Sequence, residues 1–322
     1  MIENAAPPLF PLNISRAEFV AKDIRLFEFR RNDGGELPVF TAGAHVSVCV
    51  SNGDTRKYSL CNNPSERERY VIALKRESGG RGGSKSLVDT ANTGDVLPVS
   101  APKNDFELKD IAAGYVFIAG GIGITPVLSM VRHLRSHGRA KFKLYYLSRS
   151  REDAAFADEL SAPEFRGVVK LHYDSGNPAQ MFDLWPILQQ ARGAHLYCCG
   201  PRGLMQSVRD MTGHWSSEAL HFESFVEASA THLIEDSAFV VHLARSGGSI
   251  EVPKDKSILE TLREQGVKTL SSCESGSCGT CRTLLLAGDA DHRDLVLTDE
   301  ERANHIMICV SRARTGDLTI DA

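Results

Sequence analysis

The stretch Cys273-Glu-Ser-Gly-Ser-Cys278-Gly-Thr-Cys281 lies near the C-terminus, and Cys309 follows 28 positions later. This C-x4-C-x2-C…C spacing is that of a plant-type [2Fe–2S] centre. The residues between the cysteines are small, so the backbone can wrap closely and aim N–H groups at the sulfurs of a cluster. The alternatives are unrelated buried cysteines or a zinc site, which commonly has a second C-x2-C pair that is missing here. We therefore predict that the four cysteines ligate a [2Fe–2S] cluster.

Around this stretch, the chain has the composition of a globular protein with two or three domains. It has 322 residues, of which 42% are hydrophobic and 24% are charged. No apolar run approaches the roughly 20 residues of a membrane span, and the N-terminus has no signal-peptide pattern, so we expect a cytoplasmic protein that does not bind membranes. The net charge of −4 argues against nucleic-acid binding. Residues 236–322 hold 14 acidic and 10 basic residues and so carry the whole of this net charge. The uneven distribution indicates either an ordinary solvated surface or an electrostatically steered contact.

The first 105 residues consist of short β-type segments separated by turn residues. We expect strands at 24–29, 45–50, 57–60, 70–75 and 95–100, with glycine-containing turns at 32–35, 51–54 and 79–83. Many short strands joined by such turns predict an antiparallel barrel or sandwich.

Strands and helices alternate between residues 115 and 225. Strands are expected at 115–119, 142–147, 168–172, 195–199 and 220–225, and helices at 153–160, 182–190 and 203–211. A further helix follows the first strand, with Thr125 as its N-cap and Pro126 in its first turn. This alternation predicts a doubly wound parallel sheet.

The segment 226–235 shows no periodicity, and we interpret it as a linker. Beyond it we expect a hairpin of strands 239–243 and 249–252 and a helix at 258–265 that ends at Gly266. The predicted domains are therefore 1–105, 106–227 and 236–322, with 228–235 between the second and the third.

The motif Arg56-Lys-Tyr-Ser59 on the expected strand 57–60 has the groups that a flavin site needs. Alternation along a strand places Arg56 and Tyr58 on one face, where they offer a cation for a phosphate and a ring for the isoalloxazine. Ser59 adds a hydroxyl, and the glycine-rich run before Ser84 offers backbone N–H groups to a phosphate at a helix start. An ordinary strand and a flexible turn are the alternatives.

The turn Gly120-Gly-Ile-Gly-Ile-Thr-Pro126 joins a strand to a helix. It is not a G-x-G-x-x-G fingerprint, but its position suits a pyrophosphate at the helix N-terminus. Cys199-Gly-Pro201 follows another strand and opens onto the same carboxyl edge of the sheet, where a thiol could touch a nicotinamide. Packing is the alternative for Cys199.

Together these motifs resemble the phthalate dioxygenase reductase family over nearly the whole chain. The resemblance is carried by Tyr58–Asn62, Arg81–Ser84, Tyr197–Pro201, His221–Phe225 and Ala290–Asp294, of which the last two are specific to this branch. It implies a multi-domain fold: an antiparallel flavin-binding β-barrel, a doubly wound nucleotide-binding domain and a C-terminal β-grasp ferredoxin-like domain. It also implies a monomeric enzyme that holds FMN and passes electrons from NADH, through the cluster, to a Rieske-type oxygenase.

The resemblance also implies roles for particular residues. The FMN contacts would be Arg56, Tyr58, Ser59, Leu60, Lys75, Gly83 and Ser84. The pyridine nucleotide contacts would be Gly120, Gly121, Gly123, Thr125, Asp174, Cys199 and Gly200. Ser59, Cys199 and Phe225 would act at the reacting rings, with Phe225 stacked between nicotinamide and flavin, and plain core packing is the alternative for Phe225. Asp174 favours NADH over NADPH, whereas Arg149 and Arg151 oppose that preference.

Two other functions share these motifs. One is a reductase that serves a vanillate-type O-demethylase or another aromatic-acid oxygenase instead of phthalate dioxygenase. The other is a redox-sensing electron-transfer subunit that uses the cluster without NADH, against which the two intact nucleotide turns argue.

Overall fold

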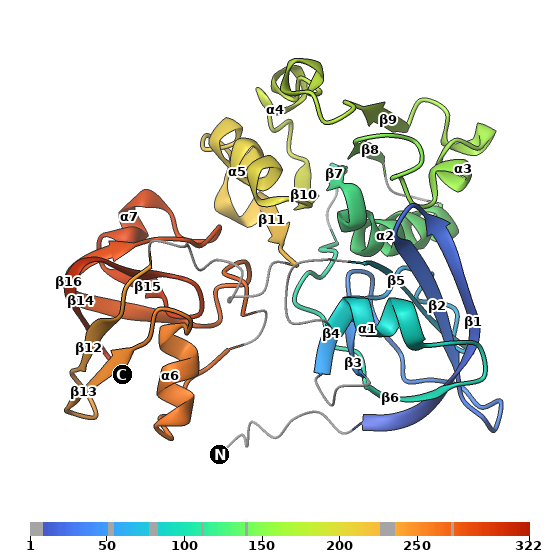
Figure 1. The fold of residues 1–322 in the computed structure, drawn as a ribbon. Coiled ribbons are helices and arrows are strands. Elements are labelled where there is room, and N and C mark those ends of the chain that lie inside the picture. Colours follow the sequence, from blue (N-terminus) through green and yellow to red (C-terminus); the bar gives the residue numbers. More distant parts are fainter. Residues whose placement is uncertain are drawn as a thin grey trace. The chain divides into compact units, whose positions relative to one another are not determined.

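The computed structural model describes residues 9–50, 55–76, 83–110, 113–138, 141–225, 236–271 and 274–322 (Figure 1). The contacts within the chain divide it into two compact units, 1–221 and 222–322. No helix in the described ranges is long and apolar enough to cross a membrane. The expected linker 226–235 lies outside the described residues.

The first unit begins with an antiparallel sheet that closes on itself. The strand order is β4-β3-β6-β1-β2-β5. The strands are β1 (Leu9–Ala21), β2 (Ile24–Arg30), β3 (His45–Cys49), β4 (Thr55–Ser59), β5 (Tyr70–Lys75) and β6 (Val96–Ser100). A bridge between Leu60 and Ile72 joins the two edge strands, β4 and β5, so the predicted barrel is confirmed. Its interior is filled by side chains such as Ile14, Phe27 and Val46, and helix α1 (Gly83–Thr90) adds Leu87 and Val88.

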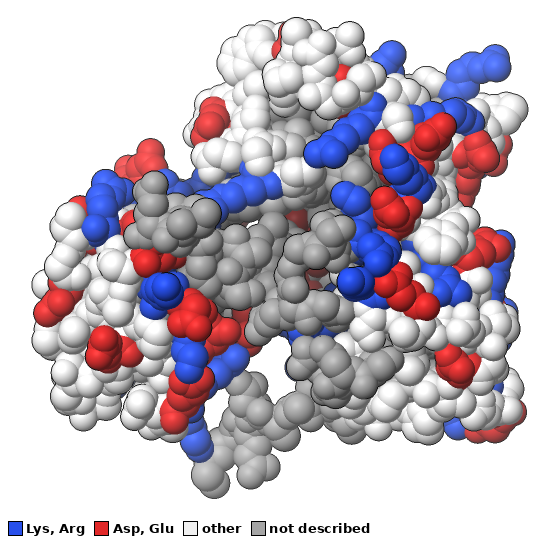
Figure 2. Space-filling model, in the orientation of Figure 1, with Lys and Arg blue, Asp and Glu red and all other residues white. Residues whose placement is uncertain are grey.

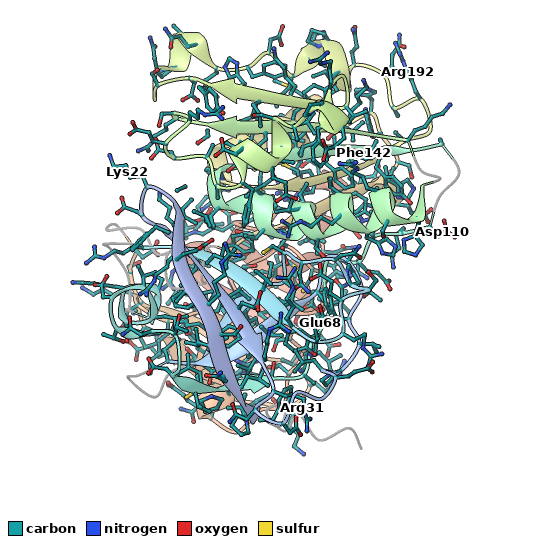
Figure 3. The ribbon with its side chains drawn as sticks, turned by 90° about the vertical axis from the view of Figure 1, so that its right-hand side faces the viewer. Lys22, Arg31, Glu68, Asp110, Phe142 and Arg192 are labelled. Atoms are coloured by element: carbon teal, nitrogen blue, oxygen red, sulfur yellow. The ribbon has the colours of Figure 1, made fainter. Side chains whose placement is uncertain are left out.

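The longest barrel strand, β1, is absent from the sequence-based prediction. It contains a proline, Pro11, and several polar residues, and its pairing with β2 is interrupted by irregularities after Ile14 and after Phe19. Its turn into β2 lies beside the next domain, because Lys22 N donates to Glu152 O at 2.7 Å. Figure 3 shows Lys22 at that turn and Arg31 at the far end of the same hairpin, with Phe142 on the parallel sheet.

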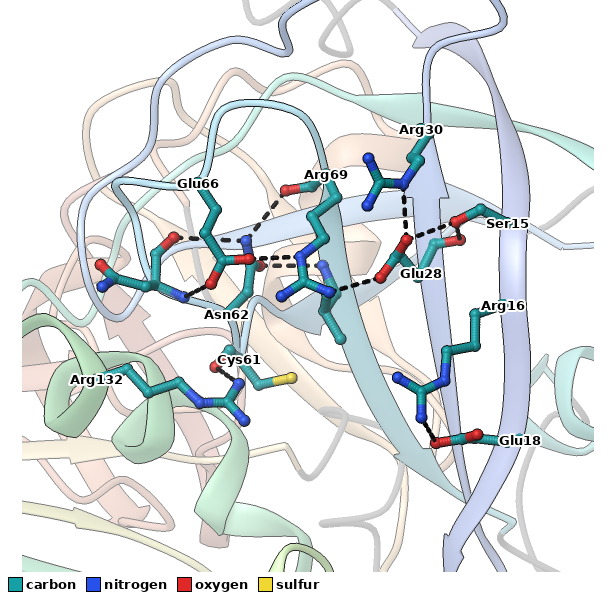
Figure 4. A network of polar contacts seen from close by, with 12 residues as sticks. Ser15, Arg16, Glu18, Glu28, Arg30, Cys61, Asn62, Glu66, Arg69 and Arg132 are labelled. Carbon is teal, nitrogen blue, oxygen red and sulfur yellow. Dashed lines mark hydrogen bonds and ion pairs between the residues drawn. The ribbon is translucent and has the colours of Figure 1, made fainter. Parts of the chain in front are cut away.

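A buried carboxylate, Glu28, ties the barrel strands together (Figure 4). It accepts hydrogen bonds from Ser15 at 2.8 Å, Arg30 at 2.7 Å and Arg69 at 2.7 Å. Burial opposes its ionisation, but the hydrogen bonds from Arg30, Arg69 and Ser15 outweigh burial and lower the pKa of Glu28 to about 2. The pairings connect β1, β2 and the start of β5.

We expect Glu28→Gln to destabilise the protein at neutral pH by about 1.5–3 kcal/mol, the usual worth of hydrogen bonds to a charged group. Because the folded-state pKa lies below the ordinary value of 4.5, the stability from ionised Glu28 is present above pH 4.5 and is lost as the pH falls toward 2. Denaturant titrations across this range should therefore show a flatter acid dependence in the variant. Glu18→Gln is the control, because Glu18 pairs with Arg16 at the exposed surface of β1. An equal effect of both variants would contradict the assignment.

The second part of the first unit is a parallel sheet of order β11-β10-β7-β8-β9. Its strands are β7 (Tyr115–Gly120), β8 (Phe142–Ser148), β9 (Val169–Tyr173), β10 (His195–Cys199) and β11 (Leu220–Glu223). The β10–β7, β7–β8 and β8–β9 pairs are all parallel, which confirms the predicted doubly wound sheet. Its helices are α2 (Ile124–His137), α3 (Ala157–Leu160), α4 (Trp185–Leu188) and α5 (Arg202–Met211).

Three helix predictions in this sheet were wrong in detail. The helices expected at 153–160 and 182–190 shrink to α3 and α4. Phe156 has φ +60° at the start of α3, and Pro186 lies in the first turn of α4. Thr125 is not an N-cap: α2 begins at Ile124 after a 3₁₀ turn, and the Thr125 hydroxyl donates to Ile122 O within the first turn.

The second unit is a mixed sheet of order β13-β12-β16-β14-β15. Its strands are β12 (Phe239–Leu243), β13 (Ser249–Val252), β14 (Arg282–Asp291), β15 (His305–Met307) and β16 (Arg312–Ile320), with helices α6 (Ile258–Glu264) and α7 (Asp299–Arg302). The pair β12–β16 is parallel and the neighbouring pairs are antiparallel. Capping boxes at Ser257 and Thr298 begin both helices. On the face in Figure 2, acidic and basic side chains of this unit are intermingled.

Candidate functional site

Strand β4 carries the expected flavin residues at the edge of the barrel. Arg56 and Tyr58 are half-buried while Thr55 and Lys57 are exposed, so the first pair shares the inner side as strand alternation predicts. Ser59 and Leu60 are buried where the barrel closes. The strand therefore presents a guanidinium and a phenol ring on one face, and the Ser59 hydroxyl follows on the other.

The other expected flavin residues lie at the end of β5 and the start of α1. Lys75 is exposed, Ser84 is half-buried, and Gly83 begins the helix, whereas residues 79–82 of the glycine-rich run lie outside the described residues. A bidentate ion pair from Arg76 to Asp89, at 2.7 and 2.9 Å, fixes α1 against the end of β5. This ion pair holds the C-terminal turn of α1, and a phosphate site would use the N–H groups at the other end of the helix.

The residues directly after β4, which carries the expected flavin residues, are held by helix α2 of the parallel-sheet domain. The Ser129 hydroxyl donates to Asn62 O at 2.9 Å, and Arg132 Nη1 donates to Cys61 O at 2.7 Å (Figure 4). Arg132 is itself paired with Glu159. Burial raises the pKa of the Cys61 thiol to about 12, so this cysteine stays protonated and packs as an apolar group. Sequence reasoning missed Arg132 and Glu159, because no motif links them to the β4 strand.

The two glycine turns of the nucleotide domain touch each other. A Cβ on Gly123 would lie 2.2 Å from Cys199 O, and one on Gly120 would lie 2.7 Å from Pro201 Cδ. Only glycine permits this approach, because any side chain would collide with the neighbouring backbone. Gly121 has φ +53° with open space where a Cβ would stand, so the turn exposes backbone there. Both turns follow adjacent strands, β7 and β10, at the carboxyl edge where parallel sheets bind ligands.

The other residues that were expected to affect nucleotide binding follow strands at the same carboxyl edge of the parallel sheet. Asp174 follows β9, and its Oδ1 accepts from Gly176 N at 2.8 Å. Arg149 follows β8 and is joined to the Asp174 turn by the hydrogen bond from Ser175 N to Arg149 O. Arg151 instead pairs with Asp158.

The predicted residues at the reacting rings have different environments. Cys199 is fully buried, next to the Gly123 backbone, and Thr125 is buried in the first turn of α2. Phe225 is 41% exposed after β11, so it is not a core residue. Its stacking against the rings stays a prediction, as do the roles of Ser59 and Cys199.

The cysteine loop of the second unit is described from Glu274 onward, and Cys273 lies outside the described residues. Cys281 and Cys309 are buried in the core of this unit, and Cys278 is half-buried. Glu274, Gly276 and Gly279 all have positive φ, so the loop is tightly coiled. A Cβ on Gly276 would lie 2.7 Å from Val310, the residue after Cys309.

These residues fit a [2Fe–2S] cluster. Three thiols come from a coiled, small-residue loop and from the segment packed against it, which are the donors that iron–sulfur centres use. In the described part of the chain no three His, Cys, Asp or Glu side chains are grouped around a single metal ion.

Comparisons with known proteins agree with this arrangement. The oxidoreductase FAD-binding domain family matches residues 11–108, the oxidoreductase NAD-binding domain family matches 117–210, and the 2Fe-2S iron-sulfur cluster binding domain family matches 241–314. The chain is 52% identical to a phthalate dioxygenase reductase of Burkholderia cepacia over 96% of both chains. It is 53% identical to a phthalate 4,5-dioxygenase oxygenase reductase subunit of Pseudomonas putida, over 94% of this chain and 93% of that one.

A solved structure is similar over almost the full length. It is a phthalate dioxygenase reductase, described as a modular structure for electron transfer from pyridine nucleotides to [2Fe–2S], with a TM-score of 0.75, 51% identity and 98% coverage of both chains. A vanillate O-demethylase oxidoreductase of a Pseudomonas strain is more distant, at 38% identity over 96% of this chain and 98% of that one.

Proposed function

Since the chain belongs to the phthalate dioxygenase reductase family, we propose that it is the reductase component of an aromatic-ring oxygenase and that its partner is phthalate dioxygenase. The higher identity to the phthalate reductases than to the vanillate reductase supports this choice. A reductase of another aromatic-acid oxygenase remains the second candidate.

One observation carries the proposal: helix α2 joins the nucleotide turn to the flavin strand. It begins directly after the Gly121–Gly123 turn, and one face of it holds the backbone of Cys61 and Asn62. A pyrophosphate bound at the turn and a ring bound along β4 would therefore be fixed by a single rigid element. This arrangement suits hydride transfer, which needs two rings held in contact.

The chain's own residues bind and orient the reactants. Arg56 and the start of α1 would hold the flavin phosphate, and Tyr58 would pack on the ring. The exposed backbone at Gly121 would receive the pyrophosphate, and Asp174 would accept from ribose hydroxyls. When bound, the flavin supplies the step that takes two electrons together from NADH and releases them singly. The four cysteines would hold the [2Fe–2S] cluster, which would pass these electrons on one at a time.

Reconstitution tests the partner. The purified reductase, NADH and the oxygenase component of phthalate dioxygenase should turn over phthalate, and a vanillate demethylase oxygenase should be served more slowly. Faster turnover with the vanillate component would transfer the assignment to that system. We also propose that the protein is a monomer in the cytoplasm. The proposed domain limits are 1–105, 106–227 and 236–322, and the family matches to 11–108, 117–210 and 241–314 support them.

We expect the bound flavin to be FMN. Arg56 and the glycine-rich run that ends at Ser84 together suit one terminal phosphate, and the sequence offers no obvious second site for an adenosine. Acid release followed by chromatography of the flavin measures this directly. Recovery of FAD, the cofactor in the name of the matching barrel family, would contradict it.

We expect kcat/KM to be higher with NADH than with NADPH. A 2′-phosphate would be repelled by the Asp174 carboxylate, and Asp174→Ala should raise kcat/KM for NADPH by about tenfold, or about 1.4 kcal/mol. Arg149→Ala is the matched change of opposite sign on the neighbouring strand end and should lower activity with NADPH. A wild-type protein that prefers NADPH would show that the arginines dominate.

A further inference from the structure

The loop that carries the cysteines contains a carboxylate that pairs with a cation on α6. Glu274 directly follows Cys273 in the sequence, and its φ of +56° is a left-handed conformation that non-glycine residues adopt only at a cost. Its partner, Arg263, lies in the last turn of α6. A carboxylate here adds negative charge to a loop whose cysteines would bind as thiolates, so the cation that pairs with it bears on both.

Arg263 joins α6 to this loop. Its Nη2 donates to Glu274 Oε1 at 2.6 Å and also to the Ser271 hydroxyl. The Ser271 hydroxyl in turn donates to the same Oε1 at 2.9 Å. The side chains of Arg263 and Glu274 are 40% and 39% exposed. An ion pair this exposed contributes little to the stability of a fold, so the pair matters chiefly for the charges that it places beside the cysteines.

The charge of Arg263 also acts on a cluster ligand. The hydrogen bond to Glu274 raises the pKa of Arg263, and the negative charges of Glu274, Glu260 and the Cys281 thiolate add to the rise. Electrostatic stabilisation is mutual, so the guanidinium stabilises negative charge at Cys281 in return. Cys281 is buried, where such interactions are screened less than at the surface. Arg263 is therefore a cation shared between the loop carboxylate and a cysteine of the cluster motif.

Other contacts hold the backbone of the loop. Leu295 N donates to Gly276 O at 2.9 Å, and a Cβ on Gly276 would lie 3.2 Å from Asp294 Cα. Asp294 is itself buried. These contacts do not involve the side chains of Arg263 and Glu274. A change in the charge of either side chain should therefore leave the loop folded.

We propose that Arg263 and Glu274 set the reduction potential of the [2Fe–2S] cluster by balancing each other's charge beside it. Reduction adds one electron, supplied by the reduced flavin, and so adds one negative charge to a group held by four thiolates. A nearby cation favours the reduced form, and a nearby anion favours the oxidised form. With both charges present, the two effects offset each other. This inference rests on the proposed function only in requiring the cluster, and it does not depend on which oxygenase receives the electron.

The test is an EPR-monitored redox titration of the full-length holoprotein with dithionite and mediators. Arg263→Gln removes the cation and should lower the potential, whereas Glu274→Gln removes the anion and should raise it. Each change should shift the ratio of reduced to oxidised cluster at a fixed ambient potential by about threefold to tenfold, or about 30 to 60 mV for a one-electron couple. The double variant should return close to the wild-type potential. Arg263→Lys keeps the charge and should also stay close to it.

Lys256→Gln and Glu264→Gln are the matched controls. This pair has a similar exposure, 37% and 55%, but it joins the two ends of α6 instead of joining α6 to the loop. Both controls should keep the wild-type potential, and the EPR line shape should be the same in every variant.

A structural role of the ion pair would give a different result. Shifts of the same sign in Arg263→Gln and Glu274→Gln, loss of the cluster in both, or no shift in either would refute the charge balance. Failure of the cluster assignment is distinguishable, because the reduced wild-type protein would then show no [2Fe–2S] signal at all.

Discussion

Replacing Cys278 by Ala is expected to abolish the low-temperature EPR signal of a reduced [2Fe–2S] centre while the flavin remains bound. Loss of one of four thiolate ligands leaves an iron site incomplete, so the cluster should not assemble or persist. Cys278 is half-buried on the coiled loop, whereas the flavin strand belongs to the other unit, so the barrel should be unaffected. Electron delivery to an oxygenase should fall to the background level.

Cys49→Ala is the matched control for this experiment. Cys49 is also half-buried, but it lies at the end of β3 in the barrel and is no part of the cysteine motif. This variant should keep both the EPR signal and the flavin. A zinc-loaded, EPR-silent wild-type protein, or a full signal in Cys278→Ala, would overturn the assignment of the ligands.

A chain ending near Ala228 is expected to fold, bind flavin and oxidise NADH with ferricyanide, yet to drive no oxygenase turnover. Residues 1–221 form a unit with barrel and sheet cores of their own, and the Arg132 contacts to Cys61 lie wholly within it. The truncation removes all four cysteines, so no cluster remains to pass single electrons to the oxygenase. Thermal unfolding, flavin content and steady-state rates with each acceptor measure the result.

The salt dependence of the full-length protein completes this test. Residues 236–322 carry the whole net charge of −4, so docking of the oxygenase through this part should weaken as ionic strength rises. Full oxygenase turnover by the truncated chain would show that the flavin delivers electrons to the partner directly, and the proposed order of transfer would be wrong.

Local patterns predicted the strands with clear boundaries. The ranges 195–199, 239–243 and 249–252 match β10, β12 and β13, because each is a short apolar or alternating segment between turn residues. β1 was missed because Pro11, Asn13 and Ser15 make it read as a loop, and it becomes a strand only through pairing with β2 and β6. Its stability comes from tertiary contacts that no local window contains.

The candidate site divides in the same way. Adjacent residues of one motif, such as Arg56 and Tyr58, could be placed on one face by periodicity alone. The contact of Gly123 with Cys199 and the hydrogen bond from Arg132 to Cys61 join residues that are far apart in sequence. These contacts depend on strand order and on the packing of the barrel against the parallel-sheet domain, which the sequence pattern leaves open.

The hydrogen bonds from α2 to Cys61 and Asn62 also bear on how this chain could be recombined with its relatives. A chimera joined between the barrel and the parallel sheet, near residue 110, would take Ser129 and Arg132 from one parent and the backbone they hold from the other. In each such hybrid, the two sides of these hydrogen bonds come from proteins in which they did not evolve together. A junction between residues 226 and 235 keeps both sides of these hydrogen bonds within one parent. Exchange of the C-terminal unit among homologues is therefore the more promising route to a reductase with a new partner.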